Sequence, residues 1–237
     1  MRSLRFPATQ GEPLSFANAG MTKQRVAILI SGRGSNMAAL IAAAGHPQFP
    51  AEIALVVSNR PTAAGLAVAG AASVKTAVVD HVPYGQDREA FERALQAELE
   101  AHRIELVCLA GFLRLLTPAF LGRWPDRLIN IHPALLPAFK GLKTHERALA
   151  AGVKIHGASV HFVVPEMDSG PIIAQGAVAV HDDDSVKTLA RRVLAIEHRL
   201  YPATLALVAA GRVTIVDGRC RIDGAKPPEL SLIVPES

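Results

Sequence analysis

The sequence predicts an α/β fold, with a single domain built on a doubly wound, mostly parallel sheet and an antiparallel portion in its second half. In the first half, short β-branched and apolar runs alternate with helical patterns, which is typical of parallel strands joined by crossover helices. In the second half, the strand-like runs 157–164 and 172–180 are joined by a segment too short for a crossover helix, so we expect an antiparallel pair. The length of 237 residues and the 50% hydrophobic content suit one domain with a sizeable core.

The expected elements follow one another along the first half of the chain. The clearest helix covers 87–102, where Phe91, Leu95 and Leu99 are spaced by four between charged residues. A glycine-rich turn follows the first strand and leads into the first helix. The expected strands lie at 25–31, 52–58, 76–80, 105–110 and 127–131, and the other helices at 37–44, after Arg60-Pro61 and near Pro118.

A long helix and a small hairpin complete the second half. The helix is expected over 185–210, with Asp184 or Ser185 as its cap and a disturbance at Pro202, because proline lacks the amide hydrogen that a helix uses. Two short apolar runs around an Asp-Gly turn predict a hairpin over 214–222.

The chain divides into three parts. We expect a disordered N-terminal extension at 1–22, one domain at 23–212, and a C-terminal hairpin with a loose tail at 213–237. The first twenty residues mix Pro, Gly and polar residues without periodicity, and Met21 before a basic stretch and a strand would be a natural start. The tail from Ala225 is rich in Pro and Glu.

Composition argues against several classes of partner and cofactor. The 25 Lys plus Arg and 21 Asp plus Glu give a net charge of only +4 with no basic run, so we expect no nucleic acid partner. No apolar run reaches the roughly 18 residues of a membrane span. Cys108 and Cys220 lack the spacing of a disulfide framework or zinc site, which suits the reducing cytoplasm. We expect no metal site, and Asp182-Asp183-Asp184 is interpreted as a solvated turn and helix cap.

Three side chains in two motifs predict a catalytic set. Asn130 and His132 lie two apart at the end of an apolar run, so in a strand both project to one face. Pro133 removes a backbone donor directly after them, at the sheet edge where α/β proteins bind ligands. Asp168, in an Asp-Ser-Gly-Pro motif, adds a carboxylate. An amide for a carbonyl oxygen, a group that titrates near neutral pH and a carboxylate suit acyl transfer. The alternative is a structural strand and turn.

The glycine-rich turn predicts a site for a phosphate group. Backbone amides at the start of a helix, the Ser35 hydroxyl and permissive glycines such as Gly34 make a cradle for an anion. The third glycine of a dinucleotide fingerprint and the Gly-Lys-Ser/Thr of a P-loop are both missing, which favours a phosphate monoester over NAD or ATP. The alternative is a tight turn in which Ser35 or Asn36 caps the helix.

The remaining histidines are interpreted as structural. His161 alternates with Ser159 on a strand and could face the site, but a satisfied core histidine is the stronger interpretation. His145 and His156 flank a short helix and are not expected to be catalytic. Four further histidines are expected in loops or at helix ends, without a specific role: His46, His81, His102 and His181.

Five motifs carry a family resemblance: Ser31-Gly-Arg-Gly-Ser-Asn36, Ala110-Gly-Phe-Leu-Arg114, Asn130-Ile-His-Pro-Ala-Leu-Leu-Pro137, His156-Gly-Ala-Ser-Val-His161 and Asp168-Ser-Gly-Pro171. In order and spacing they resemble the phosphoribosylglycinamide formyltransferases, over about residues 24–212. All folate-dependent formyltransferases of this fold share the Asn-His-Asp set, whereas the glycine-rich loop points to the branch that acts on glycinamide ribonucleotide. Arg33, where Asn is common, and Ala134, where Ser is common, depart from the family pattern.

The resemblance implies a Rossmann-like formyltransferase fold and a reaction. It implies formyl transfer from 10-formyltetrahydrofolate to the amine of glycinamide ribonucleotide, without a metal, in purine biosynthesis. Asn130 would donate a hydrogen bond to the formyl oxygen, and protonated His132 would stabilise the same oxyanion. Asp168 would favour the protonated imidazole and position a proton-shuttling water.

The resemblance also implies two binding surfaces. Gly34, Ser35 and Asn36 resemble the loop for the ribonucleotide phosphate, and Glu197 the residue near the glycinamide amine. An apolar ledge suits a flat pteridine, whose polar edge would find backbone groups. The folate surface is expected from Arg88, Leu113, Arg114, Leu115 and Leu116 and from the segment Val164, Pro165, Glu166 and Met167.

Three other functions are alternatives. A formyltetrahydrofolate deformylase shares the fold and the Asn-His-Asp set but delivers the formyl group to water, and it usually carries an N-terminal domain that 1–22 is too short to form. A methionyl-tRNA formyltransferase would need a further basic C-terminal domain. A non-enzymatic nucleotide-binding module would not require the amide, imidazole and carboxylate together. The sequence leaves the oligomeric state open.

Overall fold

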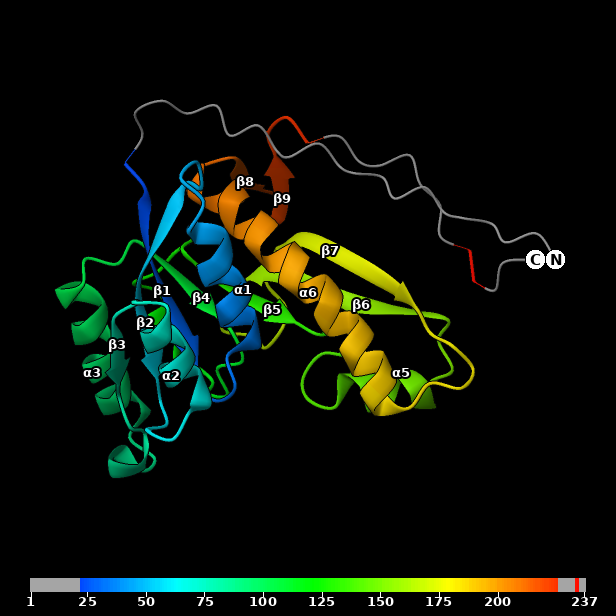
Figure 1. Ribbon diagram of the computed structural model, residues 1–237, viewed down its shortest axis with the longest axis horizontal. Helices are drawn as coiled ribbons and strands as arrows, with labels where there is room; N and C mark the ends of the chain where they lie inside the picture. The colour runs from blue at the N-terminus through cyan, green and yellow to red at the C-terminus, as the bar shows by residue number, and fades with distance from the viewer. Residues whose placement is uncertain (1–21, 226–232, 235–237) are drawn as a thin grey trace.

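The fold is built on a seven-stranded sheet, shown in Figure 1 by a computed structural model that describes residues 22–225 and 233–234. The strands of this sheet are β1 (Gln24–Ile30), β2 (Ala51–Ser58), β3 (Thr76–Val78), β4 (Leu106–Leu109), β5 (Leu128–His132), β6 (Ile155–Phe162) and β7 (Ile172–Ala179). Their order is β3-β2-β1-β4-β5-β6-β7. The pairs from β3 to β5 are parallel, whereas β6 is antiparallel to both β5 and β7. The predicted mostly parallel sheet with an antiparallel portion is therefore confirmed.

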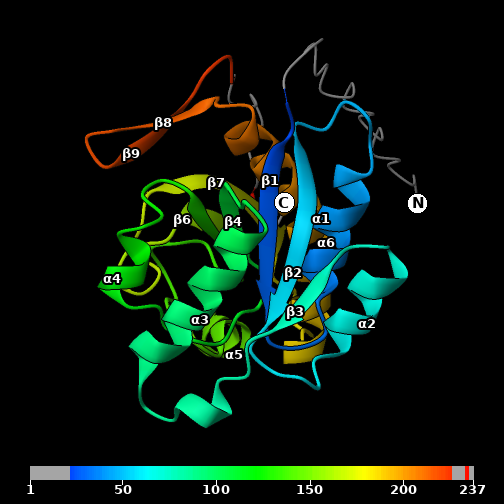
Figure 2. The same ribbon diagram turned by 90° about the vertical axis from the view of Figure 1, so that its left-hand side faces the viewer.

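Helices cover both faces of this sheet (Figure 2). They are α1 (Ser35–Ala44), α2 (Ala64–Ala71), α3 (Arg88–Ala101), α4 (Pro118–Leu121), α5 (Thr144–Ala150) and α6 (Val186–Ala209), with a 3-10 turn η1 at Val82–Tyr84. Alternate residues of β1 face opposite cores. Ile28 packs with Met37 of α1 and Tyr201 of α6, whereas its neighbour Leu29 packs with Leu95 of α3. The sheet is thus doubly wound, as predicted.

The strand order creates a switch point at the carboxyl ends of β1 and β4. From β1 the chain moves outward through β2 to β3, and then returns to place β4 on the other side of β1. The two loops that follow these strands meet, because the Ser31 amide donates to the Gly111 carbonyl at 3.1 Å. In open α/β sheets, ligands bind in the crevice at such a point. The glycine-rich loop and the loop after β4 therefore lie where a binding site is expected.

The long helix differs from its prediction at one residue. Pro202 lies inside α6, which continues unbroken to Ala209, so the expected disturbance does not end the helix. A proline removes one amide hydrogen bond from the helix, whereas the buried face that includes Tyr201 and Leu205 keeps the following turn packed. Ser185 is the N-cap and forms a reciprocal capping box with Thr188, as one of the two predicted caps.

Beyond α6, β8 (Val213–Val216) and β9 (Arg219–Ile222) form the predicted hairpin. Ile215 and Cys220 pack against the core on the α6 side of the sheet. The predictions for 1–21 and for 226–232 and 235–237 lie outside the described residues. Within the described part of the chain, no helix is long and apolar enough to cross a membrane. The same residues contain no group of three or more His, Cys, Asp or Glu side chains suited to a metal ion.

Candidate active site

The motif that was predicted to be catalytic lies at the end of β5. Asn130 and His132 are alternate residues of this strand and therefore share one face. Antiparallel pairing aligns Asn130 with His161 and His132 with Ser159 on β6. The Ser159 hydroxyl donates to the Ala134 carbonyl at 2.7 Å, which ties the chain just after β5 to β6. The strand end is thus held firmly beside its neighbour.

Asp168 faces His132, as the sequence analysis required. The distance from His132 Nδ1 to Asp168 Oδ2 is 3.4 Å, and the side chains are 7% and 11% exposed. The Gly141 amide donates to the same Oδ2 at 2.8 Å. Asp168 has a φ of +51°, a left-handed conformation that non-glycine residues adopt at a cost. This turn brings the carboxylate back over the end of β5.

The second ring nitrogen of His132 is also occupied. Its Nε2 lies 3.0 Å from the Phe139 carbonyl oxygen, which can only accept, so Nε2 carries a hydrogen. Protonation would then place the second N–H on Nδ1, which faces Asp168. The segment 139–143 therefore covers the imidazole, and its residues Phe139 and Gly141 have positive φ values of 54° and 80°.

His161 lies between Asn130 and Asp168, which the sequence analysis did not predict. Its Nδ1 donates to the Phe162 carbonyl at 2.8 Å, so its Nε2 accepts the Asn130 amide hydrogen at 3.2 Å. Burial lowers the pKa of His161, while the Phe162 carbonyl and the Asp168 charge act in the opposite direction. A neutral His161 leaves the second amide hydrogen of Asn130 free. The interpretation as a satisfied core histidine was right about burial but missed this contact.

The glycine-rich loop has the form predicted for an anion site. Gly34 is the N-cap of α1, with a φ of 73°, and no side chain caps the first turn. A Cβ added at Gly34 would lie 3.1 Å from the Gly65 Cα, at the start of α2. Only glycine therefore fits this close approach. The helix starts at Ser35 rather than at the predicted residue 37. First-turn amides of such a helix point outward toward a ligand.

Asn36 and Glu197 join this loop to α6. The Asn36 amide donates to Glu197 Oε2 at 2.8 Å, although the residues are far apart in sequence. Burial raises the pKa of Glu197, and the Asn36 hydrogen bond opposes that shift. Asn36 Oδ1 is buried and has no hydrogen-bond partner among the described residues. The two residues predicted to bind the ribonucleotide therefore contact each other, and Asn36 Oδ1 can still accept a further hydrogen bond.

Comparisons with known proteins agree with this geometry. The family model described as formyl transferase matches residues 24–205. The phosphoribosylglycinamide formyltransferase of Escherichia coli is 39% identical over 203 residues, which are 86% of this chain and 95% of that protein. A solved glycinamide ribonucleotide transformylase from Symbiobacterium toebii has a TM-score of 0.83 and 43% identity, covering 88% of this chain and 99% of that chain. The chain belongs to the formyl transferase family.

The chain also matches a much longer relative. The trifunctional purine biosynthetic protein adenosine-3 of Gallus gallus is 48% identical over 193 residues, or 81% of the chain. The match covers only 19% of that protein, so the chain spans about a fifth of its length.

The residues predicted to bind folate lie on two segments, one after β4 and one after β6. The Arg114 guanidinium stacks on the Phe91 ring of α3 with 4.8 Å to its centroid, and Arg88 begins the same helix. Leu113 and Leu115 are exposed, whereas Leu116 packs against the α3 side of the core. On the second segment, Pro165, Glu166 and Met167 are exposed and Val164 is half-buried next to the buried end of β6. The place of Arg88 on this surface stays a prediction.

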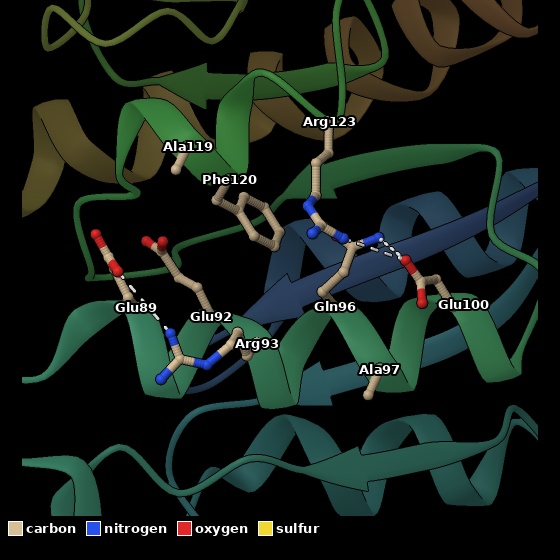
Figure 3. Close-up of a pocket in the computed structure, with 9 residues that line it drawn as sticks. All are labelled: Glu89, Glu92, Arg93, Gln96, Ala97, Glu100, Ala119, Phe120 and Arg123. Atoms are coloured by element: carbon tan, nitrogen blue, oxygen red, sulfur yellow. Dashed lines mark hydrogen bonds and ion pairs between the residues drawn. The ribbon is translucent and has the colours of Figure 1, made fainter.

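An open groove of about 310 Å³ lies elsewhere, between α3 and α4 (Figure 3). None of the predicted site residues lines it. Its charges pair with one another, because Arg93 lies 3.9 Å from Glu89 and Arg123 lies 3.5 Å from Glu100. The groove is therefore an open space between two helices, separate from the predicted site residues.

Proposed function

We propose that the protein transfers the formyl group of 10-formyltetrahydrofolate to the primary amine of glycinamide ribonucleotide. The products are formylglycinamide ribonucleotide and tetrahydrofolate, in purine biosynthesis. The observation that carries the proposal is the meeting of Asn130, His132 and Asp168 at one end of β5. The similarity to a bacterial phosphoribosylglycinamide formyltransferase over most of both chains supports the same assignment.

In the proposed reaction, the amine nitrogen attacks the formyl carbon and the carbonyl electrons move to oxygen. The free hydrogen of the Asn130 amide donates to this oxygen, and protonated His132 adds a second donor. The bond from carbon to the folate N10 then breaks, and the proton lost by the amine reaches N10. Because Phe139 now holds the Nε2 hydrogen of His132, the segment 139–143 must release it during the step.

Asp168 supports this chemistry through its charge. Its carboxylate lies 3.4 Å from His132 Nδ1 and would accept the Nδ1 hydrogen of the protonated ring. Its Oδ1 lies 3.7 Å from His161 Nε2, and a water molecule bound to this carboxylate would carry the proton from the amine to the folate. Direct transfer needs no metal, since a deprotonated amine is already a nucleophile.

The two substrates are proposed to bind on either side of this centre. Gly34, Ser35 and Asn36 hold the ribonucleotide phosphate through backbone amides at the start of α1. Glu197 lies next to Asn36 and would bind the ammonium or amine end of the same molecule. The folate would lie on the exposed leucines after β4 and on the segment 164–167. Both substrates are small molecules, and we place the reaction in the cytoplasm.

An assay with purified protein tests the proposal. Formylglycinamide ribonucleotide and tetrahydrofolate should appear in equal amounts when both substrates are present. A reaction without the amine is the control, since a deformylase would release formate and tetrahydrofolate at the same rate there. Amine-independent release of formate would contradict the transferase assignment.

A further inference from the structure

Ser31 connects the loop that is proposed to bind phosphate with the loop that is proposed to bind folate. It follows β1 directly and is 4% exposed. Its amide donates to the Gly111 carbonyl at 3.1 Å, and its hydroxyl oxygen accepts the Leu113 amide hydrogen at 2.8 Å. The same hydroxyl donates to Asn59 Oδ1 at 2.6 Å, at the end of β2. One buried side chain thus joins three strand ends.

The loop after β4 has a second anchor at its far end. Both oxygens of the buried Glu92 carboxylate accept hydrogen bonds from Thr117, from its amide at 2.7 Å and from its hydroxyl. Figure 3 shows Glu92 on α3, beside α4. Between these anchors, Leu113 and Leu115 are exposed and available to a ligand. The position of the segment 113–116 therefore depends on Ser31 at one end and on Glu92 at the other.

The glycine-rich loop is also held in place, by its contacts with Gly65 of α2. The Gly65 amide donates to the Gly32 carbonyl at 3.0 Å, and a Cβ at Gly65 would come within 2.6 Å of Ile30 Cδ1. This contact leaves the loop little freedom to move toward α2. A shift of the glycine-rich loop that a ligand causes would therefore pass to the loop after β4, through the Ser31 hydroxyl.

We propose that Ser31 is a positioning residue that couples the two substrate sites, so that binding of one substrate strengthens binding of the other. The inference rests on the proposed function, because it takes the two loops as the two substrate sites. The Ser31 hydroxyl accepts the Leu113 amide hydrogen of the loop after β4, while the Ser31 backbone leads directly into the glycine-rich loop, and Asn59 fixes the hydroxyl. Order in one loop is thereby transmitted to the other. Coupling between binding sites is reciprocal, so each substrate must raise the affinity of the other by the same factor.

The test measures that factor by calorimetry. Tetrahydrofolate carries no formyl group, so it can be titrated with and without saturating glycinamide ribonucleotide while no reaction occurs. In the wild-type protein, the ribonucleotide should lower the dissociation constant of tetrahydrofolate about 5-fold or more. Titrating the ribonucleotide with and without tetrahydrofolate should give the same factor.

Ser31→Ala should bring the factor close to 1. Because the factor is a ratio of two affinities, a weaker affinity for tetrahydrofolate alone does not change this expectation. Ser58→Ala is the matched control, because Ser58 is also a buried serine at a strand end, and its hydroxyl contacts only Arg60 in its own turn. That control should keep the wild-type factor. Ser31→Cys, which keeps the size of the side chain but bonds weakly through sulfur, serves if the alanine variant does not fold. It should also lower the factor.

Two outcomes would overturn the coupling while leaving the proposed function intact. One is a wild-type factor of 1 with both ligands bound, and the other is an equal factor in the wild type and the Ser31 variants. Failure of the wild-type protein to bind either ligand alone would instead contradict the proposed function itself. The two failures are therefore distinguishable in one set of titrations.

Discussion

The side-chain amide of Asn130 donates to His161 Nε2 across the β5–β6 pair, at 3.2 Å. The Phe162 carbonyl fixes the His161 ring by accepting from its other nitrogen. Asparagine carries two amide hydrogens, so the second can point into the site while the first holds the orientation. His161 thereby determines where the proposed oxyanion donor points.

Replacing His161 should slow formyl transfer without weakening substrate binding. His161→Phe keeps the ring and removes the acceptor, so the Asn130 amide loses its orientation. Because removing one oxyanion donor costs about 10²-fold or more, we expect kcat to fall by about 10-fold to 10²-fold with little change in KM. In an Asn130→Ala background the same substitution should cost nothing further. Fully additive losses would show that His161 acts elsewhere.

His132→Asn should reduce turnover by about 10²-fold or more, because it removes both a charged donor and a proton carrier. Asparagine keeps a polar group of similar reach, so both substrates should still bind. Steady-state rates and equilibrium titrations separate the two effects. Undiminished kcat in a folded variant would remove His132 from the mechanism.

Asp168→Asn should lower kcat by about 10-fold to 10²-fold, because the amide keeps the shape but not the charge that favours the imidazolium. Its remaining oxygen can still accept the Gly141 amide hydrogen. Ser169→Ala is the neighbouring control, since its hydroxyl bonds only to Lys140 and the Met167 carbonyl. Equal activity of the two variants would contradict a role for the charge.

His156 makes a prediction about stability and pH. It is 1% exposed and packs against the rings of Phe139 and His145, and burial lowers its pKa from 6.5 to about 4. The unfolded chain binds this proton more readily, so stability should fall as the pH drops from about 6.5 toward 4. By pH 5 the loss would reach about 2 kcal/mol. Urea unfolding at pH 7.5 and 5.0 measures it, and His156→Phe should reduce the pH dependence. An unchanged pH dependence in the variant would exclude His156 as the cause.

Much of the fold was predictable, because its main signals are local. The two-residue spacing of Asn130 and His132 placed both on one strand face, and the turn at Gly34 placed the loop before a helix. The antiparallel strands followed from the short segment between them. Pro202 was predicted less well, because packing of the buried helix face outweighs one missing hydrogen bond.

The hydrogen bonds and turns that hold the site residues in place could not be predicted from local sequence patterns. His161 and Ser31 act through partners 31 and 82 residues away in sequence, which only the sheet brings together. The left-handed turns at Phe139 and Asp168 give no sequence signal comparable to glycine, yet they close the site over His132. The alternation of His161 with Ser159 did not distinguish a core residue from a site residue.

Gly34→Val should act on the phosphate of the substrate. Its φ of 73° and the 3.1 Å approach to Gly65 leave no room for a side chain, so valine would distort the loop amides. The KM for glycinamide ribonucleotide should rise about 10-fold or more, with little change in the KM for 10-formyltetrahydrofolate. Gly85→Val, which places valine at another left-handed glycine with open space around it, is the control for backbone strain.

The most direct test of the proposed substrate compares glycinamide ribonucleotide with glycinamide riboside, which lacks the phosphate, in the wild type and in Gly34→Val. The measured quantity is kcat/KM for the four combinations, which form a thermodynamic cycle between the loop and the phosphate. The riboside should be a poor substrate for the wild type and should lose little more in the variant. Equal losses for the two substrates would contradict phosphate binding by Gly34, Ser35 and Asn36.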